Sequence, residues 1–193
     1  SLDVQDLMGD EDWLIFDGGN THFWSEIAVN MAGWRGQKLG GIMHPGNYSL
    51  LGVGVSFGVS AKALNPASNV VVISGDGAFL SGGLSIEAAF QENLPITIVI
   101  DNNGGLDCIS QQQERLFANG KHFATDFRDI PFHTMCEGLG GHGEVVETRD
   151  QLRPALERAM ASGKVALVNV KCRGVISPIV AATSDKRDKA SIE

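Results

Sequence analysis

Residues 74–105, SGDGAFLSGGLSIEAAFQENLPITIVIDNNGG, predict the fold of this chain. An apolar, β-branched run at 70–73 leads into the glycine turn at 75–77, and an amphipathic helical segment follows. A second apolar run at 96–100 then ends at the polar residues 101–103. We expect a strand–helix–strand unit with parallel strands, because such crossovers are right-handed and return the chain in the same direction.

A carboxylate and a carboxamide come directly after these two strands. Parallel strands bring their carboxyl ends to one edge of a sheet, so we expect Asp76 and Asn103 to face the same crevice. Two hard oxygen ligands beside a helix N-terminus, which favours anions, would suit a magnesium diphosphate.

The rest of the chain continues the alternation of strands and helices. Asn20 or Thr21 is placed to cap the helix that follows the first strand. Thr148 and Gln151 have capping-box spacing, which predicts another helix start. The expected segments are a strand at 13–16, a helix to about 34, an ordered loop at 35–49, a buried helix at 50–64, a loop with some helix at 104–126, a helix at 130–139, a strand at 144–147, a helix ending near 162–163 and a strand at 165–170.

This order predicts an α/β fold: a doubly wound, mostly parallel sheet with helices on both faces. At 193 residues the chain fits a single domain, 1–193. Its tail becomes polar from about residue 178 and is expected to fray or to pack on a partner.

Charge and cysteine usage narrow the function classes. The net charge is −8 and no basic cluster precedes Lys186-Arg187, which argues against nucleic acid and anionic membranes as partners. Cys108, Cys136 and Cys172 form no metal-binding pattern and are interpreted as reduced thiols. With neither a leader-like N-terminus nor an apolar run of membrane-spanning length, the sequence predicts a cytoplasmic protein.

The turn Gly75-Asp76-Gly77, followed after 24 residues by Asn102-Asn103, resembles the GDG…NN signature of thiamine-diphosphate-dependent enzymes, in their diphosphate-binding domain. The turn at 17–19, the segment at 51–66 and the sequence LGGHGE at 139–144 extend the resemblance over most of the chain. Within the family it looks closest to acetolactate-synthase-like, 2-hydroxyacyl-CoA lyase and oxalyl-CoA decarboxylase sequences.

The resemblance implies thiamine diphosphate and Mg²⁺ as cofactors. It assigns the side chains of Asp76 and Asn103 and the carbonyl of Gly105 to the metal. It places Leu51 beneath the thiamine, with the Ser49 carbonyl accepting from the aminopyrimidine. The cofactor contacts that it implies are Gly18, Gly19, Asn20, Ser49, Leu51, Gly75, Gly77, Ala78, Cys108 and Ile109.

No catalytic residue is assignable in this chain. In the family, a glutamate on a separate pyrimidine-binding domain activates the cofactor, so the resemblance implies a partner domain or subunit that supplies it, in a hetero- or homo-oligomer. The implied reaction breaks or forms a carbon–carbon bond next to a carbonyl, in a 2-oxo acid or 2-hydroxyacyl substrate. The implied enzyme is therefore a lyase, decarboxylase or carboligase, of which this chain is one part.

Other histidines and acids have weaker claims. His44 and His122 fall on loops at the expected mouth of the site, where histidine can transfer protons, but a solvated or structural role is favoured for each. His142 lies in a glycine turn and is interpreted as structural, and Glu87 as a packing or capping residue.

Three alternatives remain open. The chain length also fits the small subunit of a two-chain 2-oxo acid decarboxylase, similar to sulfopyruvate decarboxylase. A catalytically silent subunit that binds cofactor only to hold an assembly together is a second alternative. A flavodoxin-like or Rossmann-like nucleotide binder is disfavoured, because no GxGxxG follows the first strand and Asn102-Asn103 would have no task.

Overall fold

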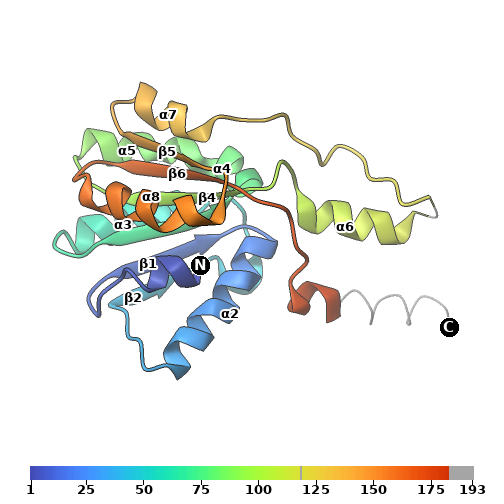
Figure 1. Ribbon diagram of the computed structural model, residues 1–193, viewed down its shortest axis with the longest axis horizontal. Coiled ribbons are helices and arrows are strands. Elements are labelled where there is room, and N and C mark those ends of the chain that lie inside the picture. Colours follow the sequence, from blue (N-terminus) through green and yellow to red (C-terminus); the bar gives the residue numbers. More distant parts are fainter. Residues whose placement is uncertain (118, 183–193) are drawn as a thin grey trace.

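A six-stranded sheet forms the centre of the molecule (Figure 1), in a computed structural model that describes residues 1–117 and 119–182. The strand order is β2-β1-β3-β4-β6-β5, and every neighbouring pair is parallel. This confirms the predicted doubly wound α/β fold. The strands are β1 (Trp13–Asp17), β2 (Gly41–Met43), β3 (Val70–Gly75), β4 (Thr97–Asn102), β5 (His142–Val146) and β6 (Ala166–Lys171).

Helices cover both faces of the sheet. One hydrophobic core is formed with α3, α4, α5 and α7, and the opposite core with α1, α2 and α8. Helix α6 stands away from the sheet near its carboxyl edge (Figure 1). The helices are α1 (Leu2–Gln5), α2 (Asn20–Trp34), α3 (Gly54–Leu64), α4 (Asp76–Gly82), α5 (Ile86–Gln91), α6 (Asp107–Leu116), α7 (Phe132–Gly138) and α8 (Arg149–Ala161), with short 3₁₀ turns η1 (Gly46–Tyr48) and η2 (Gly83–Ser85).

The central strand β3 explains why its sequence is apolar without alternation. Val70 and Val72 enter one core, whereas Val71 and Ile73 enter the other. Successive side chains of a strand point to opposite faces, and here both faces are covered, so every position must be apolar. None of the helices within 1–117 and 119–182 combines the length and apolarity needed to cross a bilayer.

The strand order reverses beside β1. The chain leaves β1 toward the edge strand β2 and then returns to β3 on the other side of β1. In the β1–β3 ladder Asp17 lies opposite Ser74, and in the β3–β4 ladder Gly75 lies opposite Asp101. The segments after β1, β3 and β4 therefore leave the sheet together, at the switch point where open parallel sheets bind ligands.

Two local predictions at the N-terminal half are wrong. Helix α2 has Gly19 at its N-cap position with no side-chain cap bond, and Asn20 and Thr21 lie inside its first turn. Asn20 instead hydrogen bonds to Gln111 and to the backbone of Ser177. The loop predicted at 35–49 contains β2, which is only three residues long and lacks a β-branched run.

Glycine decides where the next helices begin and end. The helix predicted at 50–64 starts only at Gly54, because Gly52 has a φ of 92°. The helix after the 75–77 turn is divided into α4, η2 and α5 around Gly82 and Gly83.

The C-terminal third follows the predictions more closely. The capping box of Thr148 and Gln151 is confirmed at the start of α8. Residues 178–182 are helical. The remainder of the tail, 183–193, lies outside the described residues.

Candidate functional site

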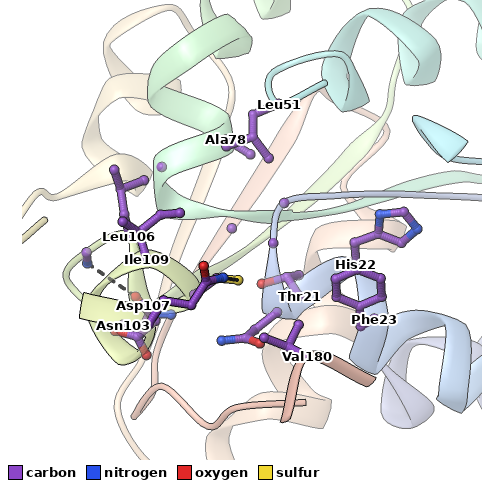
Figure 2. A pocket seen from close by; sticks show the side chains of 18 of the residues that line it. Thr21, His22, Phe23, Leu51, Ala78, Asn103, Leu106, Asp107, Ile109 and Val180 are labelled. Atoms are coloured by element: carbon purple, nitrogen blue, oxygen red, sulfur yellow. Dashed lines mark hydrogen bonds between the residues drawn. The ribbon is translucent and has the colours of Figure 1, made fainter. Parts of the chain in front are cut away.

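A cavity of about 530 Å³ opens where β1, β3 and β4 end (Figure 2). Its wall is formed by the segments that follow these strands, by residues that precede α3, by α6 and by the C-terminal Val180. The structure brings all of the predicted site residues to this one wall: Gly18, Gly19, Asn20, Ser49, Leu51, Gly75, Asp76, Gly77, Ala78, Asn103, Gly105, Cys108 and Ile109.

Asp76 is a buried carboxylate held by backbone amides. It is the first residue of α4 and is only 2% exposed. Its Oδ1 accepts from the amide of Gly77 at 2.7 Å, and its Oδ2 accepts from the amides of Gly104 at 2.8 Å and Gly105 at 3.1 Å. Burial raises the pKa of Asp76, and the backbone hydrogen bonds oppose that rise. The carboxylate is thus oriented by dipoles, and its charge is costly to keep buried.

The side-chain oxygen of Asn103 converges on Asp76. Asn103 Oδ1 accepts from the Gly105 amide at 3.2 Å, and this amide also reaches Asp76 Oδ2. No side chain fits at Gly105, because a Cβ there would lie 2.5 Å from the Thr125 carbonyl oxygen. The result is a pair of neighbouring hard oxygens, one charged and one neutral, which is the donor chemistry that Mg²⁺ prefers.

The glycine turn after β1 closes another side of the cavity. Gly18 has a φ of 120°, and a Cβ there would lie 3.1 Å from the Gly75 backbone nitrogen. A Cβ at Gly19 would lie 3.0 Å from Cys108 Cβ. The turn therefore packs tightly against the end of β3 and against α6, and it presents the uncapped N-terminus of α2 to the cavity. Such an N-terminus favours a negatively charged ligand.

Leu51 reaches the cavity wall through a turn that Asp17 anchors. Asp17 Oδ2 accepts from the amides of Gly52 at 2.9 Å and Gly54 at 2.7 Å. Leu51 itself stays 38% exposed and lines the cavity, as does Ser49, whose φ of 49° is unusual for a non-glycine residue. The anchoring role of Asp17 had no signal in the sequence beyond its place before a glycine turn.

Helix α6 supplies the wall opposite Leu51. The Leu106 side chain, just before the helix, packs so closely on Gly77 that a Cβ at Gly77 would overlap it. Burial raises the pKa of Cys108, so this residue is a protonated thiol in the wall rather than a nucleophile at neutral pH. Asp107 fits against Gly174, where an added Cβ would overlap its carboxylate.

The C-terminal segment folds back toward the cavity. The indole Nε1 of Trp24 donates to the Val175 carbonyl at 2.9 Å, and the Ser177 amide donates to Asn20 Oδ1 at 3.1 Å. Val180 then lines the cavity and is 5% exposed. Through its other side-chain atom, Nδ2, Asn20 donates to Gln111 of α6 at 3.2 Å, so this one residue joins three parts of the wall.

The histidines that the sequence analysis discussed lie outside the described cavity wall. His122 bonds to Glu114 and Asp126 in an exposed cluster, and His142 bonds to Glu144. His44 stacks on Phe16, with ring centroids 5.0 Å apart.

Sequence reasoning missed part of the wall. No motif marks these residues, because their positions follow from how α2, α6 and the C-terminal segment pack. The further lining residues are His22, Phe23, Leu106, Asp107, Arg115, Leu116 and Val180.

The fold and the cavity define a ligand-binding α/β domain with its site at the switch point of a parallel sheet. Residues 17–170 match the family described as "Thiamine pyrophosphate enzyme, C-terminal TPP binding domain". The chain belongs to this family, which excludes the flavodoxin-like or Rossmann-like alternative.

Similar proteins span several activities. The chain is 37% identical over 126 residues to a "Probable acetolactate synthase" of Mycobacterium bovis, covering 65% of this chain and 23% of that protein. It is 30% identical over 145 residues to a 2-hydroxyacyl-CoA lyase of Arabidopsis thaliana, covering 73% of this chain and 25% of that protein. It is 34% identical over 140 residues to an oxalyl-CoA decarboxylase of Escherichia coli K12, covering 72% of this chain and 24% of that protein. The chain thus spans about a quarter of the length of these curated relatives.

Among solved structures, the fold is similar to that of a thiamine diphosphate-dependent 4-hydroxybenzoylformate decarboxylase of Rhodococcus jostii RHA1. The TM-score is 0.75 at 24% sequence identity, and the match covers 91% of this chain and 32% of that chain.

Proposed function

We propose that this chain holds the diphosphate and Mg²⁺ of thiamine diphosphate in an enzyme that breaks or forms a carbon–carbon bond next to a carbonyl. The observation that carries the proposal is the convergence of Asp76 and Asn103 oxygens on the Gly105 amide, in the wall of the switch-point cavity. Asp76, Asn103 and the Gly105 carbonyl are the proposed metal ligands.

A divalent cation fits this donor set on electrostatic grounds. The donors described for Asp76 are backbone amides, which orient the carboxylate without neutralising it. A diphosphate beside an uncompensated carboxylate would be repelled, and a cation between them removes that repulsion. The glycines at 18 and 19 and the N-terminus of α2 then supply close backbone contacts to the anionic group.

The apolar wall suits the ring end of the same cofactor. Leu51 and Ala78 line the cavity away from Asn103, and Ile109 adds an apolar side chain beside Leu106 (Figure 2). We assign Leu51 to support the thiamine from below and the Ser49 carbonyl to orient its aminopyrimidine. When bound, thiamine diphosphate supplies a nucleophilic carbon and an electron sink for the cleaved bond.

The activating glutamate is expected from a pyrimidine-binding domain or subunit. Among the described residues that line the cavity there is no glutamate. The rim also exposes apolar side chains: Leu51 is 38%, Ile109 45% and Leu116 71% exposed. A second domain or chain packed on this rim would bury them and complete the site, which makes the active species a hetero- or homo-oligomer or a longer chain.

A 2-oxo acid or 2-hydroxyacyl compound is the proposed substrate class. Arg115 of α6 is the one lysine or arginine among the described lining residues, and it offers a cation to a substrate carboxylate or other anionic group. The reaction would be that of a lyase, decarboxylase or carboligase like the relatives above. A cytoplasmic location is part of the proposal, and the free thiols of Cys108, Cys136 and Cys172 agree with it.

Calorimetry with thiamine diphosphate tests the site. We expect binding that requires Mg²⁺, disappears with chelator and is lost in Asp76→Ala. The matched control is Asp10→Ala, which removes an exposed aspartate in a turn remote from the cavity wall. Binding without Mg²⁺ that survives Asp76→Ala would refute the ligand assignment.

A second assay tests the need for a partner. Turnover of a 2-oxo acid should appear only when a pyrimidine-binding domain or chain is added. Robust turnover by a verified monomer of this chain would contradict the half-site. Mg²⁺-dependent binding without turnover in any completed assembly would instead support the silent-subunit alternative.

A further inference from the structure

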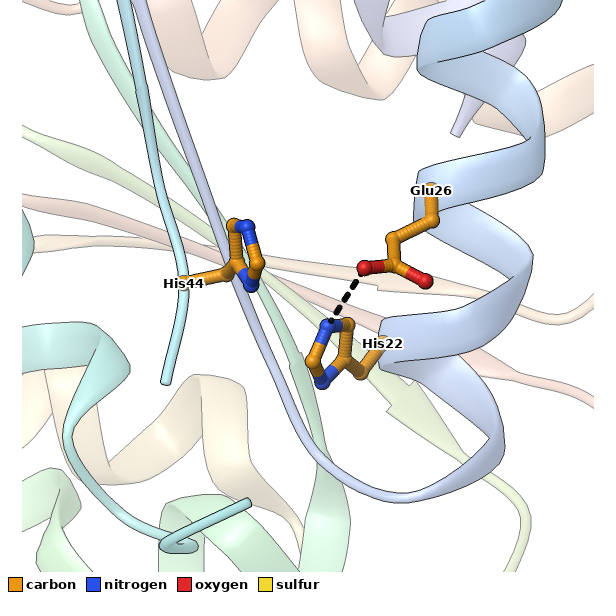
Figure 3. Close-up of side chains that lie close together, drawn as sticks. All are labelled: His22, Glu26 and His44. Carbon is orange, nitrogen blue, oxygen red and sulfur yellow. Dashed lines mark hydrogen bonds and ion pairs between the residues drawn. The ribbon is translucent and has the colours of Figure 1, made fainter. Parts of the chain in front are cut away.

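Three side chains of types that can bind a metal converge beside the cavity. His22 and Glu26 come from α2 and His44 from the segment after β2, and all three point toward one another (Figure 3). One ligand atom from each lies within 4.8 Å of the other two. His22 Nε2 and Glu26 Oε1 are 3.2 Å apart.

The fold fixes this arrangement. His22 and Glu26 are four residues apart, so they share one face of α2. Strand β2 pairs with β1, which brings His44 alongside Phe16, and the two rings stack at 5.0 Å with an interplanar angle of 6°. The His22 and His44 ring centroids are 5.0 Å apart. The Phe23 ring stacks on the His22 ring, with their centroids 5.2 Å apart.

We propose that His22, Glu26 and His44 form a binding site for a borderline divalent cation of the Zn²⁺ class. Two imidazole nitrogens and one carboxylate oxygen are a donor set that zinc accepts, with a fourth position left for water or another ligand. Mg²⁺ prefers an all-oxygen shell, so this site and the proposed Asp76 site select different metals.

The distances are close to what such a cation needs. With metal–ligand bonds of about 2.0–2.1 Å, two ligands of a tetrahedral zinc are about 3.3 Å apart. The His22–Glu26 separation of 3.2 Å already matches this edge. The His44 nitrogen lies within 4.8 Å of the other two ligand atoms, so it has to move closer by at most about 1.5 Å to complete a tetrahedral site.

The hydrogen bond that His44 makes in this structure is weak competition for a metal. His44 Nδ1 accepts from the Gly46 amide at 3.2 Å, a long bond whose exchange costs little. The His22 side chain is 4% exposed and that of Glu26 is 34% exposed, so the site is shielded yet reachable. Because His22 also lines the cavity, a bound cation would lie at the cavity wall.

Titration of the chelator-treated chain with Zn²⁺, followed by calorimetry, tests the proposal. We expect one equivalent to bind, unaffected by excess Mg²⁺, and Glu26→Gln and His44→Ala each to weaken binding at least about tenfold. Asp76→Ala should leave zinc binding unchanged. His122→Ala is the matched control: its two carboxylate partners lie on opposite ring nitrogens, Glu114 at 3.1 Å and Asp126 at 2.9 Å, and cannot share one cation with it.

Several outcomes would overturn the site. Absence of stoichiometric zinc binding would do so, as would equal binding by Glu26→Gln, His44→Ala and the unsubstituted chain. A loss in His122→Ala as large as in His44→Ala would mean adventitious surface binding. If a variant fails to fold, the absorption of the Co²⁺-loaded unsubstituted chain decides: intense bands of four-coordinate cobalt support the site, and a weak six-coordinate spectrum refutes it.

Discussion

Two carboxylates, one in an edge strand and one just after a central strand, have different kinds of hydrogen-bond partners. Glu144, in the edge strand β5, accepts from Arg158 at 2.8 and 2.9 Å and pairs with His142 at 3.0 Å. The Arg158 guanidinium lowers the pKa of Glu144. Asp76, after the central strand β3, is oriented by backbone amides, and burial raises its pKa.

The difference separates structure from function. Glu144 has its counter-charge within the fold and needs nothing further. Among the described residues, the groups that hydrogen bond to Asp76 are backbone dipoles, so burial of its charge costs free energy that an added cation would offset. A buried carboxylate with a raised pKa in a cavity is a common property of functional sites, and here it coincides with the strand-order switch.

Replacing the carboxylate by a carboxamide at Asp76 and at Glu144 should give the largest difference in cofactor binding. Asp76→Asn should weaken Mg²⁺-dependent binding of thiamine diphosphate by roughly 100-fold or more, because a charged metal ligand is lost. Glu144→Gln should leave binding unchanged. Calorimetry of both variants measures this. Equal losses in the two would erase the distinction between these carboxylates.

Asp17 tests whether burial alone marks a functional carboxylate. It is 1% exposed, yet its Oδ2 serves the amides of Gly52 and Gly54 and it is outside the described cavity wall. Asp17→Ala should cost roughly 3 kcal/mol of unfolding free energy by leaving the buried Gly54 amide and the partly buried Gly52 amide without this acceptor. Asp17→Asn keeps one acceptor oxygen and should restore more than half of that loss in chemical denaturation. No rescue by Asn would mean that the charge itself is required.

The shape of the cavity can be changed without changing its charge. Gly77→Ala should destabilise the fold by about 1–2 kcal/mol and weaken cofactor binding, because the new Cβ displaces Leu106. Gly33→Ala is the control: no atom lies within 4 Å of its Cβ, and alanine in α2 should stabilise by roughly 0.5–1 kcal/mol. Urea unfolding distinguishes the two. A Gly77→Ala chain as stable as the parent would show that Leu106 yields freely.

The smallest effect is expected at the Glu144 pair. Arg158 is 56% exposed at its side chain, so Arg158→Ala should lower Tm by less than about 2 °C. The folded-state pKa of Glu144 is lowered from 4.5, so the pair stabilises the fold above that pH and loses its effect as pH falls through the lowered pKa. Melting curves recorded from pH 7 downward should therefore show a difference between parent and variant that is full above pH 4.5 and shrinks as the pH falls further. A difference that stays constant as the pH falls would require another role for Arg158.

The sequence predicted the parts of the molecule that repeat a local pattern. The apolar run of β3, the capping box of α8 and the parallel sheet all follow from periodicity and end signals. Because parallel strands share one carboxyl edge, the meeting of Asp76 and Asn103 could also be predicted.

What the sequence did not predict depends on packing between distant segments. β2 has only three residues, and its pairing with β1 is a tertiary event. The sequence suggested Asn20 as a helix cap, but its side chain hydrogen bonds to Gln111 and Ser177, which are distant in sequence. Val180 reaches the cavity wall, and the amides of Gly52 and Gly54 reach Asp17, only because segments distant in sequence fold back.

The all-parallel sheet has a kinetic consequence. Within residues 1–117 and 119–182 no two neighbouring strands are joined by a hairpin, so each of these ladders must close a long loop before its hydrogen bonds form. Chains dominated by such distant pairings fold slowly. Because the cavity needs β1, β3 and β4 side by side, we expect it to form late in folding. A ligand of this cavity would then slow unfolding of the finished domain rather than speed its assembly.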